Sequence, residues 1–366
     1  MRVDFMLSPR GLSRHWTYFS TMTNDSNSFV RPPEPPTCIV MFSGGLDSTI
    51  AAHLLSSQGL DVRLLHFVLP FESGMGRTHA AVRDYAQRLG LPLIVREEGE
   101  EFLSVVKDPH FGYGKNANPC VDCRISRVRK AGDVMREIGA RFIATGEVVG
   151  QRPMSQRRDA MDAVAKRSGL KGLLLRPLSA KVLKPTVPEE QGWVDRDRLM
   201  GITGRGRRDQ LDYARAHGLR FSAPGGGCVL TQPVTGARFE DLRTHTPDFD
   251  LTDFKLLAYG RHFRLSPSCK LVMGRNEQEN RLLTDLARDS DYLLRPVAAK
   301  GPEAVGRGEE ASPGDVSRAC SLLARYCRPR PGQTVAVEVR HRGTRETIET
   351  EAASEEACDW LMIRPR

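Results

Sequence analysis

The chain has 366 residues, with 54 Lys or Arg against 45 Asp or Glu and a formal net charge of +9. This length gives room for two domains that each bury a core. The sequence has no apolar run of the roughly 20 residues needed to span a bilayer, and its start lacks a signal-peptide core. We therefore expect a soluble, cytoplasmic protein without a membrane partner.

The first 36 residues predict a flexible N-terminal extension. They are polar between Thr23 and Ser28, and they end in a Pro-rich stretch from Arg31 to Pro36. Such a composition cannot bury enough apolar surface to form a core of its own. The first folded domain is expected to begin at Thr37.

An apolar run begins at Thr37 and predicts a β-strand, which leads into a Gly-rich loop and then, near Ser48, into helical spacing. Adjacent glycines let the backbone pass close to a ligand, and the free N–H groups at a helix start suit a phosphate-sized anion. The carboxylate and hydroxyls of the loop are suitable Mg²⁺ ligands. The predicted anion site comprises Ser43, Gly44, Gly45, Leu46, Asp47 and Ser48. A loop that only turns the chain is the alternative.

The pattern then alternates between strands and helices. Strands are predicted at 62–68, 91–95 and 141–144, and helices at 78–89 and 122–138. Such alternation predicts an α/β fold with a parallel, Rossmann-like sheet, whose ligand lies at the carboxyl ends of the strands. The side chains expected at that edge are His66, Phe67, Thr145, Gly146, Gln151 and Arg152. For His66 and Phe67, contact with an adenine and packing inside the core remain equally open.

Two cysteines, Cys120 and Cys123, lie three residues apart at a predicted helix start, and Cys228 follows three glycines. The helix N-terminus and the Arg and Lys residues that follow are expected to lower the thiol pKa values. Three interpretations stay open: a zinc site, a persulfide-carrying redox pair with a resolving thiol, and a 4Fe-4S cluster with three protein ligands. A disulfide scaffold is not expected, because the eight cysteines are sparse and unevenly spaced.

The stretch from Cys120 to Arg220 contains 22 Lys or Arg against 12 Asp or Glu, while the rest of the chain is close to neutral. A concentrated basic surface favours a nucleic-acid partner, because phosphate contacts supply most non-specific affinity. A solvated charged face is the alternative. After about residue 233, short β-like runs at 270–273 and 334–339 and a helix at 315–326 predict a second, small α+β domain. The predicted domains are 37–235 and 250–366.

Three segments, the loop at 43–48, the Cys-x-x-Cys segment 118–123 and the segment 144–156, follow one another as in PP-loop tRNA thiouridylases. The chain resembles the PP-loop ATP pyrophosphatases, and within them the 4-thiouridine synthases and 2-thiouridylases. The resemblance implies ATP and Mg²⁺ as cofactors, tRNA as substrate, and a sulfur donor that is sulfide, a persulfide or a cysteine desulfurase system. It implies adenylation of a uridine carbonyl, followed by replacement of its oxygen with sulfur to give 4-thiouridine or 2-thiouridine.

The resemblance also implies roles for individual residues. The catalytic residues are Asp47, Cys120, Cys123 and Cys228. One branch of the 2-thiouridylases has Asp at the first Cys-x-x-Cys position. This chain keeps Cys120 and so looks like the branch in which three cysteines hold a 4Fe-4S cluster. Arg152 or Lys181 is expected to help stabilise developing charge.

The segments 259–265 and 272–276 resemble an RNA-binding domain of ribosome-quality-control factors, the NFACT-R type. A homodimer is a further expectation. Two other functions remain open: a PP-loop ligase of the amidating type, and an RNA-binding protein that keeps the loop without catalysis. The sequence does not choose the uridine, the atom or the sulfur donor.

Overall fold

The computed structural model describes residues 35–71, 77–223, 228–308 and 311–365. The predicted N-terminal extension therefore lies almost wholly outside the described residues, as do the three glycines before Cys228. Among the helices in the described ranges, none combines the length and the apolar character that crossing a bilayer requires.

The first part of the chain forms a parallel sheet, five-stranded within the described residues, in the order β3-β2-β1-β4-β5. Its strands are β1 (Thr37–Met41), β2 (Asp61–Val68), β3 (Leu93–Glu97), β4 (Phe142–Thr145) and β5 (Leu174–Leu175). The longer helices around it are α1 (Leu46–Ser56), α2 (Arg77–Leu89), α3 (Glu100–Lys107), α4 (Cys120–Glu137), α5 (Arg158–Arg167) and α7 (Arg208–Ala216). The shorter helices are η1 (Ala180–Val182), α6 (Val187–Glu190), η2 (Arg196–Arg198) and η3 (Val229–Thr231). This confirms the predicted α/β fold.

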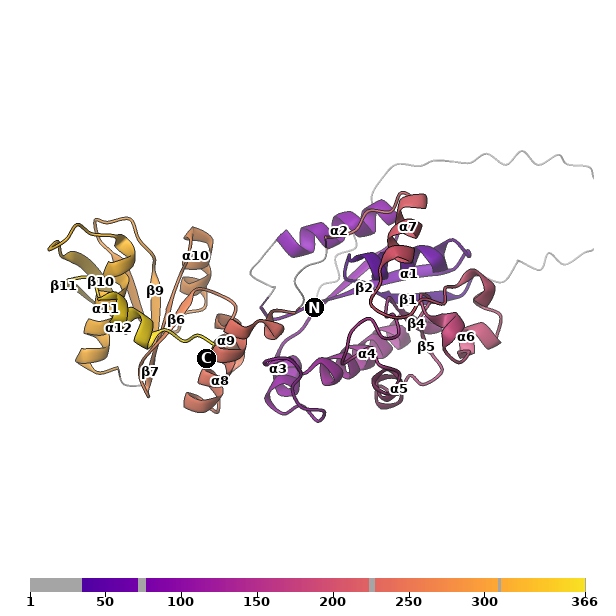
Figure 1. The fold of residues 1–366 in the computed structure, drawn as a ribbon, viewed down its shortest axis with the longest axis horizontal. Helices are drawn as coiled ribbons and strands as arrows, with labels where there is room; N and C mark the ends of the chain where they lie inside the picture. The colour runs from indigo at the N-terminus through magenta and orange to yellow at the C-terminus, as the bar shows by residue number, and fades with distance from the viewer. Residues whose placement is uncertain (1–34, 72–76, 224–227, 309–310, 366) are drawn as a thin grey trace, which may run out of the picture. The chain divides into compact units, whose positions relative to one another are not determined.

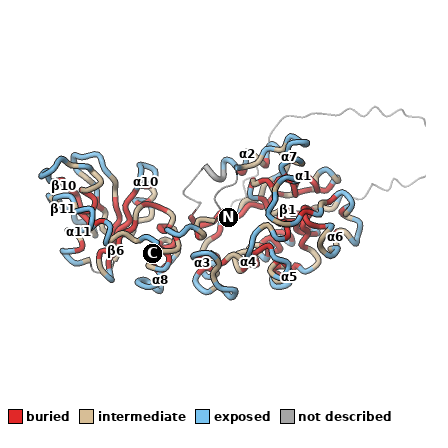
Figure 2. The backbone as a smooth tube through the Cα atoms, in the orientation of Figure 1, coloured by how far each residue is buried: buried red, intermediate tan, exposed pale blue. Residues whose placement is uncertain are grey.

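Helices cover both faces of this sheet (Figure 1). In β1, Cys38 and Val40 belong to the apolar cluster beneath α1, whereas Ile39 belongs to the cluster beneath α4 and α5. This alternation follows from the two-residue period of a strand, and burial on both faces explains why β1 reads as a continuous apolar run. Figure 2 shows buried residues along the strands of the parallel sheet.

Two helices, α8 (Pro233–His245) and α9 (Leu251–Leu256), span the interval between the predicted domains. They contribute Phe239 and Phe254 to an apolar cluster that also contains Phe102 of α3. The phenolic oxygen of Tyr259 donates a hydrogen bond to the Phe71 carbonyl at 3.0 Å. The segment between the two predicted domains is therefore packed helical structure. The predicted domain boundaries at residues 235 and 250 stay predictions.

The C-terminal part forms an antiparallel sheet, six-stranded within the described residues, in the order β11-β10-β8-β9-β7-β6. Its strands are β6 (Arg261–Ser266), β7 (Cys269–Met273), β8 (Tyr292–Pro296), β9 (Ala304–Arg307), β10 (Val335–His341) and β11 (Thr344–Thr350). The helices are α10 (Glu277–Asp285), α11 (Pro313–Cys327) and α12 (Glu355–Leu361). The predicted runs 270–273 and 315–326 fall within β7 and α11, and the run 334–339 overlaps β10, which begins one residue later at Val335. The core packs α11 against the sheet through Leu322 and Leu323, which are fully buried.

A buried charge cluster joins α8 to this second sheet. The Asp241 carboxylate lies 2.7 Å from Arg264 and 3.3 Å from the Lys270 ammonium. Burial lowers the pKa of Lys270 to about 8, a shift that Asp241 opposes and Arg264 reinforces. Lys270 therefore loses its proton in the folded protein at a lower pH than in the unfolded chain.

The Lys270 pKa predicts a stability difference that depends on pH. Between pH 8 and about 10.4, the ordinary lysine value, the unfolded state binds more protons, so this residue's contribution to stability rises with pH. Compared with Lys270→Met, the wild type should gain free energy of unfolding over this window at up to about 1.4 kcal/mol per pH unit. Urea unfolding of both proteins at pH 7, 8, 9 and 10 measures it. A constant difference would show that Lys270 titrates at its ordinary pKa.

Candidate functional site

The strand order reverses between β1 and β4, which are neighbours in the sheet. The Gly-rich loop follows the carboxyl end of β1, and Thr145 and Gly146 stand at the carboxyl end of β4. A Cβ on Gly146 would lie 2.5 Å from the Asp47 carbonyl carbon and from the Ser48 nitrogen, so the two loops are in contact. In open α/β sheets this topological switch point is where ligands bind.

Hydrogen bonds fix the conformation of the Gly-rich loop between Ser43 and Ser48. Gly44 has φ of 73°, a conformation that favours glycine, and its carbonyl accepts from the Ser222 amide at 2.8 Å. The Ser48 hydroxyl donates to the Gly45 carbonyl at 3.0 Å and accepts from the Ser43 amide at 3.3 Å. Among the described residues, no side chain caps the first turn of α1, which leaves its N–H groups available to an anion.

The Asp47 carboxylate has one oxygen in use and one without a partner. Its Oδ2 accepts from the Gln151 amide at 2.8 Å, and its Oδ1 is buried without a hydrogen-bond partner among the described residues. A buried, unsatisfied carboxylate oxygen beside an anion site fits a Mg²⁺ ligand. The Gln151 side chain is in turn contacted by Gln210 of α7, whose Nε2 lies 3.5 Å from the Gln151 Oε1. The sequence analysis missed Gln210, because nothing in its local pattern distinguishes it from other polar residues of α7.

A second feature missed from sequence is Glu147, a buried carboxylate that connects α4 to this edge. It lies 3.2 Å from Arg124 and 3.1 Å from Arg176, and it accepts a hydrogen bond from Thr145 at 3.0 Å. Burial alone would raise the pKa of Glu147, but the two guanidinium groups outweigh it and hold that pKa below its ordinary value. The start of α4 is thereby fixed to the end of β4.

Backbone contacts bring Cys228 to the start of α4, where Cys120 and Cys123 lie. The Ala117 amide donates to the Leu230 carbonyl at 3.2 Å, which ties the segment before Cys120 to the one after Cys228. Cys123 and Cys228 are both half-buried against the apolar cluster of α3, α8 and α9. The structure therefore brings the segment that carries Cys228 close to the start of α4, although Cys228 follows Cys123 by more than 100 residues in the sequence.

The expectation that the helix start and its cations lower the thiol pKa is wrong for Cys123. Burial raises the pKa of Cys123, although Arg127 and Arg124 partly oppose the shift. Burial raises the pKa of Cys228 to about 11, and the nearby Cys123 and Cys120 add to that shift. The sequence showed the cations but not the apolar cluster, and desolvation of the thiolate is the larger effect here.

Within the described ranges, no three Cys, His, Asp or Glu side chains are placed to hold one metal ion. The zinc, persulfide and 4Fe-4S interpretations of Cys120, Cys123 and Cys228 all stay predictions. Three half-buried thiols would be a chemically suitable donor set for a 4Fe-4S cluster. The assignment of these residues to a cluster remains a prediction.

The other predicted nucleotide-site residues differ in placement. His66 is buried, with its Nδ1 2.9 Å from the carbonyl of Phe42, the residue just before the loop. Phe67 packs in the core beneath α4. Arg152 is exposed, and the Lys181 ammonium donates to the Asp197 carbonyl at 2.8 Å. Their roles towards a nucleotide stay predictions.

The contact between the two loops predicts that Gly146→Ala is harmful. The added Cβ would overlap backbone atoms of Asp47 and Ser48, which a side-chain rotation cannot relieve. We expect displacement of the Gly-rich loop, a loss of about 1–3 kcal/mol in the free energy of unfolding, and a several-fold rise in KM for ATP. Urea unfolding and ATP turnover measure these effects. Gly206→Ala is the control, since a Cβ there meets no atom within 4 Å, and equal behaviour of the two variants would refute the predicted contact.

Two families match separate parts of the chain. The family described as "Thiamine biosynthesis protein (ThiI)" matches residues 36–182, and the family described as "NFACT protein RNA binding domain" matches residues 260–361. The first range contains the Gly-rich loop, the Cys-x-x-Cys segment and Glu147. The second range covers most of the antiparallel sheet domain.

Curated relatives are similar to about a third of the chain. The tRNA-specific 2-thiouridylase MnmA of Bradyrhizobium sp. (strain ORS 278) is 32% identical over 150 residues, which cover 36% of this chain and 37% of that protein. The MnmA of Syntrophotalea carbinolica is 42% identical over 119 residues, which cover 30% of this chain and 33% of that protein. The chain thus spans about a third of the length of these relatives.

Solved structures with some similarity include the U34-tRNA thiolase NcsA from Methanococcus maripaludis with its 4Fe-4S cluster. It is 15% identical, with a TM-score of 0.33, over 61% of this chain and 72% of its own. The two family matches confirm both resemblances seen in the sequence. Residues 36–182 belong to a ThiI-type PP-loop domain, and residues 260–361 belong to an NFACT-type RNA-binding domain.

Proposed function

We propose that this protein is an ATP-dependent tRNA sulfurtransferase, which activates a uridine carbonyl with ATP and replaces the oxygen with sulfur. The observation that carries the proposal is the connection of two sites. The PP-loop and the start of α4, which carries Cys120 and Cys123, are both fixed to the carboxyl edge of the parallel sheet, the loop through its contact with Gly146 and α4 through the Arg124–Glu147 ion pair. Relatives named tRNA-specific 2-thiouridylase are similar to about a third of this chain.

In the first step, the PP-loop binds the β- and γ-phosphates of ATP through the N–H groups of the first turn of α1. Asp47 Oδ1 is the ligand available to Mg²⁺, and Gln151 holds the other carboxylate oxygen in place. The uridine carbonyl oxygen attacks the α-phosphorus, and pyrophosphate leaves. Fixed backbone dipoles aimed at the developing charge supply the rate enhancement.

In the second step, a sulfur nucleophile attacks the activated carbon, and AMP leaves with the former carbonyl oxygen. Cys120, Cys123 and Cys228 are the residues that hold the sulfur source. A 4Fe-4S cluster on three thiolates would supply an iron with an open coordination position. Arg124 and Arg127, which lie close enough to oppose the raised pKa of Cys123, favour negative charge on sulfur there.

The remaining assignments follow from the same proposal. The product is 4-thiouridine or 2-thiouridine, and the sulfur source is sulfide, a persulfide or a cysteine desulfurase system. The reaction is placed in the cytoplasm, on tRNA held by the basic surface between residues 120 and 220 and by the C-terminal domain. A homodimer is compatible with this proposal.

The test is mass spectrometry of tRNA nucleosides from a strain that lacks the gene and is complemented with variants. We expect the thiolated nucleoside to disappear on deletion, to return with the wild type and with Cys327→Ser, and to stay absent with Cys228→Ser. Cys327 is a half-buried cysteine of the C-terminal domain and serves as the matched control. Normal thiolation in the Cys228→Ser strain would refute the proposal.

The same purified proteins separate the two other functions. An amidating ligase would convert ATP to AMP with ammonia and would not need the three thiols. A non-catalytic RNA-binding protein would bind tRNA without forming AMP. AMP formation that depends on tRNA, with sulfur incorporated into the tRNA, excludes both.

A further inference from the structure

The two edges of the antiparallel sheet differ in what covers them (Figure 1). At one edge, the end of the chain bridges β6: Phe263 pairs with Met362, and the Ile363 amide donates to the His262 carbonyl at 2.8 Å. At the other edge, β11 pairs with β10 and with no further strand among the described residues. An edge strand of this kind presents a row of unpaired N–H and C=O groups to another chain.

The strand β11 lacks several features that keep edge strands from pairing. It is seven residues long, it contains no proline, and its register with β10 runs from Thr344 to Thr350 without a bulge. The register of β6 with β7, by contrast, is irregular between Arg264 and Ser266. Threonine and isoleucine, which favour strands, make up four of the seven residues of β11. This edge is therefore able to extend the sheet by one more strand.

The charges of β11 are arranged symmetrically about its middle residue, Thr347. Arg345 lies two residues before Thr347, and Glu349 lies two residues after it. If two copies of β11 pair antiparallel with Thr347 at the centre, Arg345 of each copy lies directly opposite Glu349 of the other, on the same face of the sheet. All seven residues then pair, and a two-fold axis relates the copies. A register centred on Glu346 would instead place two carboxylates opposite each other.

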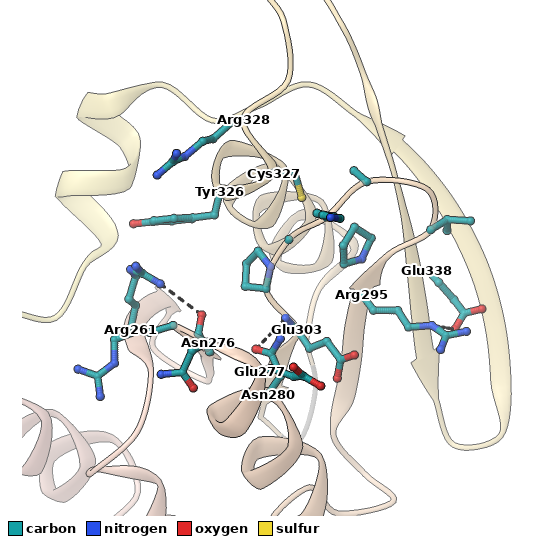
Figure 3. A pocket seen from close by; sticks show the side chains of 18 residues that line it. Arg261, Asn276, Glu277, Asn280, Arg295, Glu303, Tyr326, Cys327, Arg328 and Glu338 are labelled. Atoms are coloured by element: carbon teal, nitrogen blue, oxygen red, sulfur yellow. Dashed lines mark hydrogen bonds and ion pairs between the residues drawn. The ribbon is translucent and has the colours of Figure 1, made fainter.

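The surroundings of Arg345 favour an additional carboxylate. The Arg345 Nε lies 3.4 Å from the Glu338 carboxylate. Arg295 and Arg340 bind the same carboxylate, at 2.8 and 2.6 Å, so three guanidinium groups share one negative charge. Figure 3 shows the Arg295 side chain beside Glu338. Glu349 is exposed, and it has no ion-pair partner in the part of the chain that the structure describes. Glu349 of a second copy would therefore offset the excess positive charge around Arg345.

We propose that two copies of this chain pair through β11, antiparallel and centred on Thr347, and so join their six-stranded sheets into one continuous sheet. The edge at β6 is already occupied by the end of the chain, so the assembly closes as a dimer. A contact limited to one strand pair buries less than the roughly 1,600 Å² of a standard stable interface, so we expect a weak dimer with a Kd of about 10–100 μM. This surface lies outside the PP-loop and the cysteine segments, and its use does not depend on the sulfurtransferase proposal.

Sedimentation velocity of the full chain, from about 1 μM to about 500 μM, measures this assembly. We expect a monomer at the lowest concentration, a dimer at the highest, and no larger species. Arg345→Glu should raise the dimer Kd about tenfold, because it replaces two attractive cross-strand pairs with two repulsive ones, and Glu349→Arg should do the same. A wild type that stays monomeric throughout would overturn the proposal, and so would growth beyond the dimer.

Combining Arg345→Glu with Glu349→Arg tests the register. The double variant again has opposite charges at both cross-strand positions, so its Kd should return to within about threefold of the wild type. A double variant that dimerises no better than the single variants would overturn the proposed register.

Arg281→Glu is the matched control for Arg345→Glu. Arg281 of α10 is also an exposed arginine paired with a carboxylate, Glu277, but it lies outside β11. It should change the dimer Kd less than about twofold, because it faces no charge of the second copy. Equal effects of Arg281→Glu and Arg345→Glu would overturn the proposal, because they would indicate general surface charge.

A cysteine at the two-fold axis tests the centre of the register independently. Directly opposite residues of an antiparallel pair have Cα atoms about 4.5–5.5 Å apart, a separation that a disulfide can bridge. On oxidation with copper phenanthroline in air, Thr347→Cys should form a covalent dimer on a non-reducing gel. Thr344→Cys, which would lie opposite Thr350, should not. Equal cross-linking of the two variants would overturn the centre on Thr347. Cys228→Ser should dimerise like the wild type, so this proposal and the sulfurtransferase proposal fail independently.

Discussion

Replacing Asp47 with Asn is expected to lower tRNA-dependent conversion of ATP to AMP by at least about 100-fold without disturbing the fold. The amide oxygen of Asn can still accept the 2.8 Å hydrogen bond from Gln151, so the side chain should keep its position. What is lost is the negative charge on the buried Oδ1, the atom that has no partner among the described residues. Loss of one fixed electrostatic contact to the reacting phosphates typically costs 10²–10³ in rate.

Steady-state AMP formation as a function of Mg²⁺ concentration measures this effect. The variant should need more Mg²⁺ for half-maximal rate as well as turning over more slowly. Asp61→Asn is the control, because Asp61 is the first residue of β2 and pairs with Arg63, at the opposite end of the strand from the ligand edge. If Asp47→Asn keeps the wild-type Mg²⁺ dependence, Asp47 is not the metal ligand.

Glu147→Gln should reduce the free energy of unfolding by about 3 kcal/mol or more. Removing one member of a buried ion cluster leaves the others without compensation, and this typically costs 3–5 kcal/mol. Here Arg176, buried like Glu147 itself, would lose its only carboxylate partner within the described residues, and Arg124 would lose its contact to the end of β4. The connection between α4, which carries Cys120 and Cys123, and the carboxyl end of β4 should weaken as well.

Urea unfolding at pH 7 measures the loss, with Glu137→Gln as control. Glu137 also pairs with an arginine, Arg96, but its side chain is 62% exposed, so its loss should cost less than about 1 kcal/mol. The pKa of Glu147 is held below its ordinary value of about 4.3, so its contribution is present at neutral pH and is lost as the pH falls through the folded pKa. Equal losses in the two variants would show that burial of Glu147 does not matter.

The sequence predicted what depends on local pattern. The strand before Ser43, the glycine loop and the Cys-x-x-Cys helix are each defined by a few consecutive residues, and all are found where expected. The antiparallel domain was predicted less completely. Strands such as β11, an edge strand with mostly exposed residues, lack the apolar run that marks β1.

What the sequence could not predict depends on which distant residues meet. Glu147 stands in the predicted loop after β4, yet its pairing with Arg124 and Arg176 needs the sheet order and the packing of α4. The pKa of the Cys123 thiol was predicted in the wrong direction, because the cations near it are adjacent in sequence while the apolar cluster that buries it comes from α3, α8 and α9. Charge is local along the chain, whereas desolvation is a property of the packed molecule.

The hydrogen bond from Ser222 to the PP-loop sets a limit on how far sulfur can travel. Ser222 is bound to Gly44, and Cys228 follows only six residues later in the chain. Six peptide units have a contour length of no more than about 22 Å, so the backbone of Cys228 cannot lie farther than that from Ser222. In the proposed reaction, sulfur held by Cys228 would therefore stay within about that distance of the loop, and a sulfur donor would have to come within the same reach.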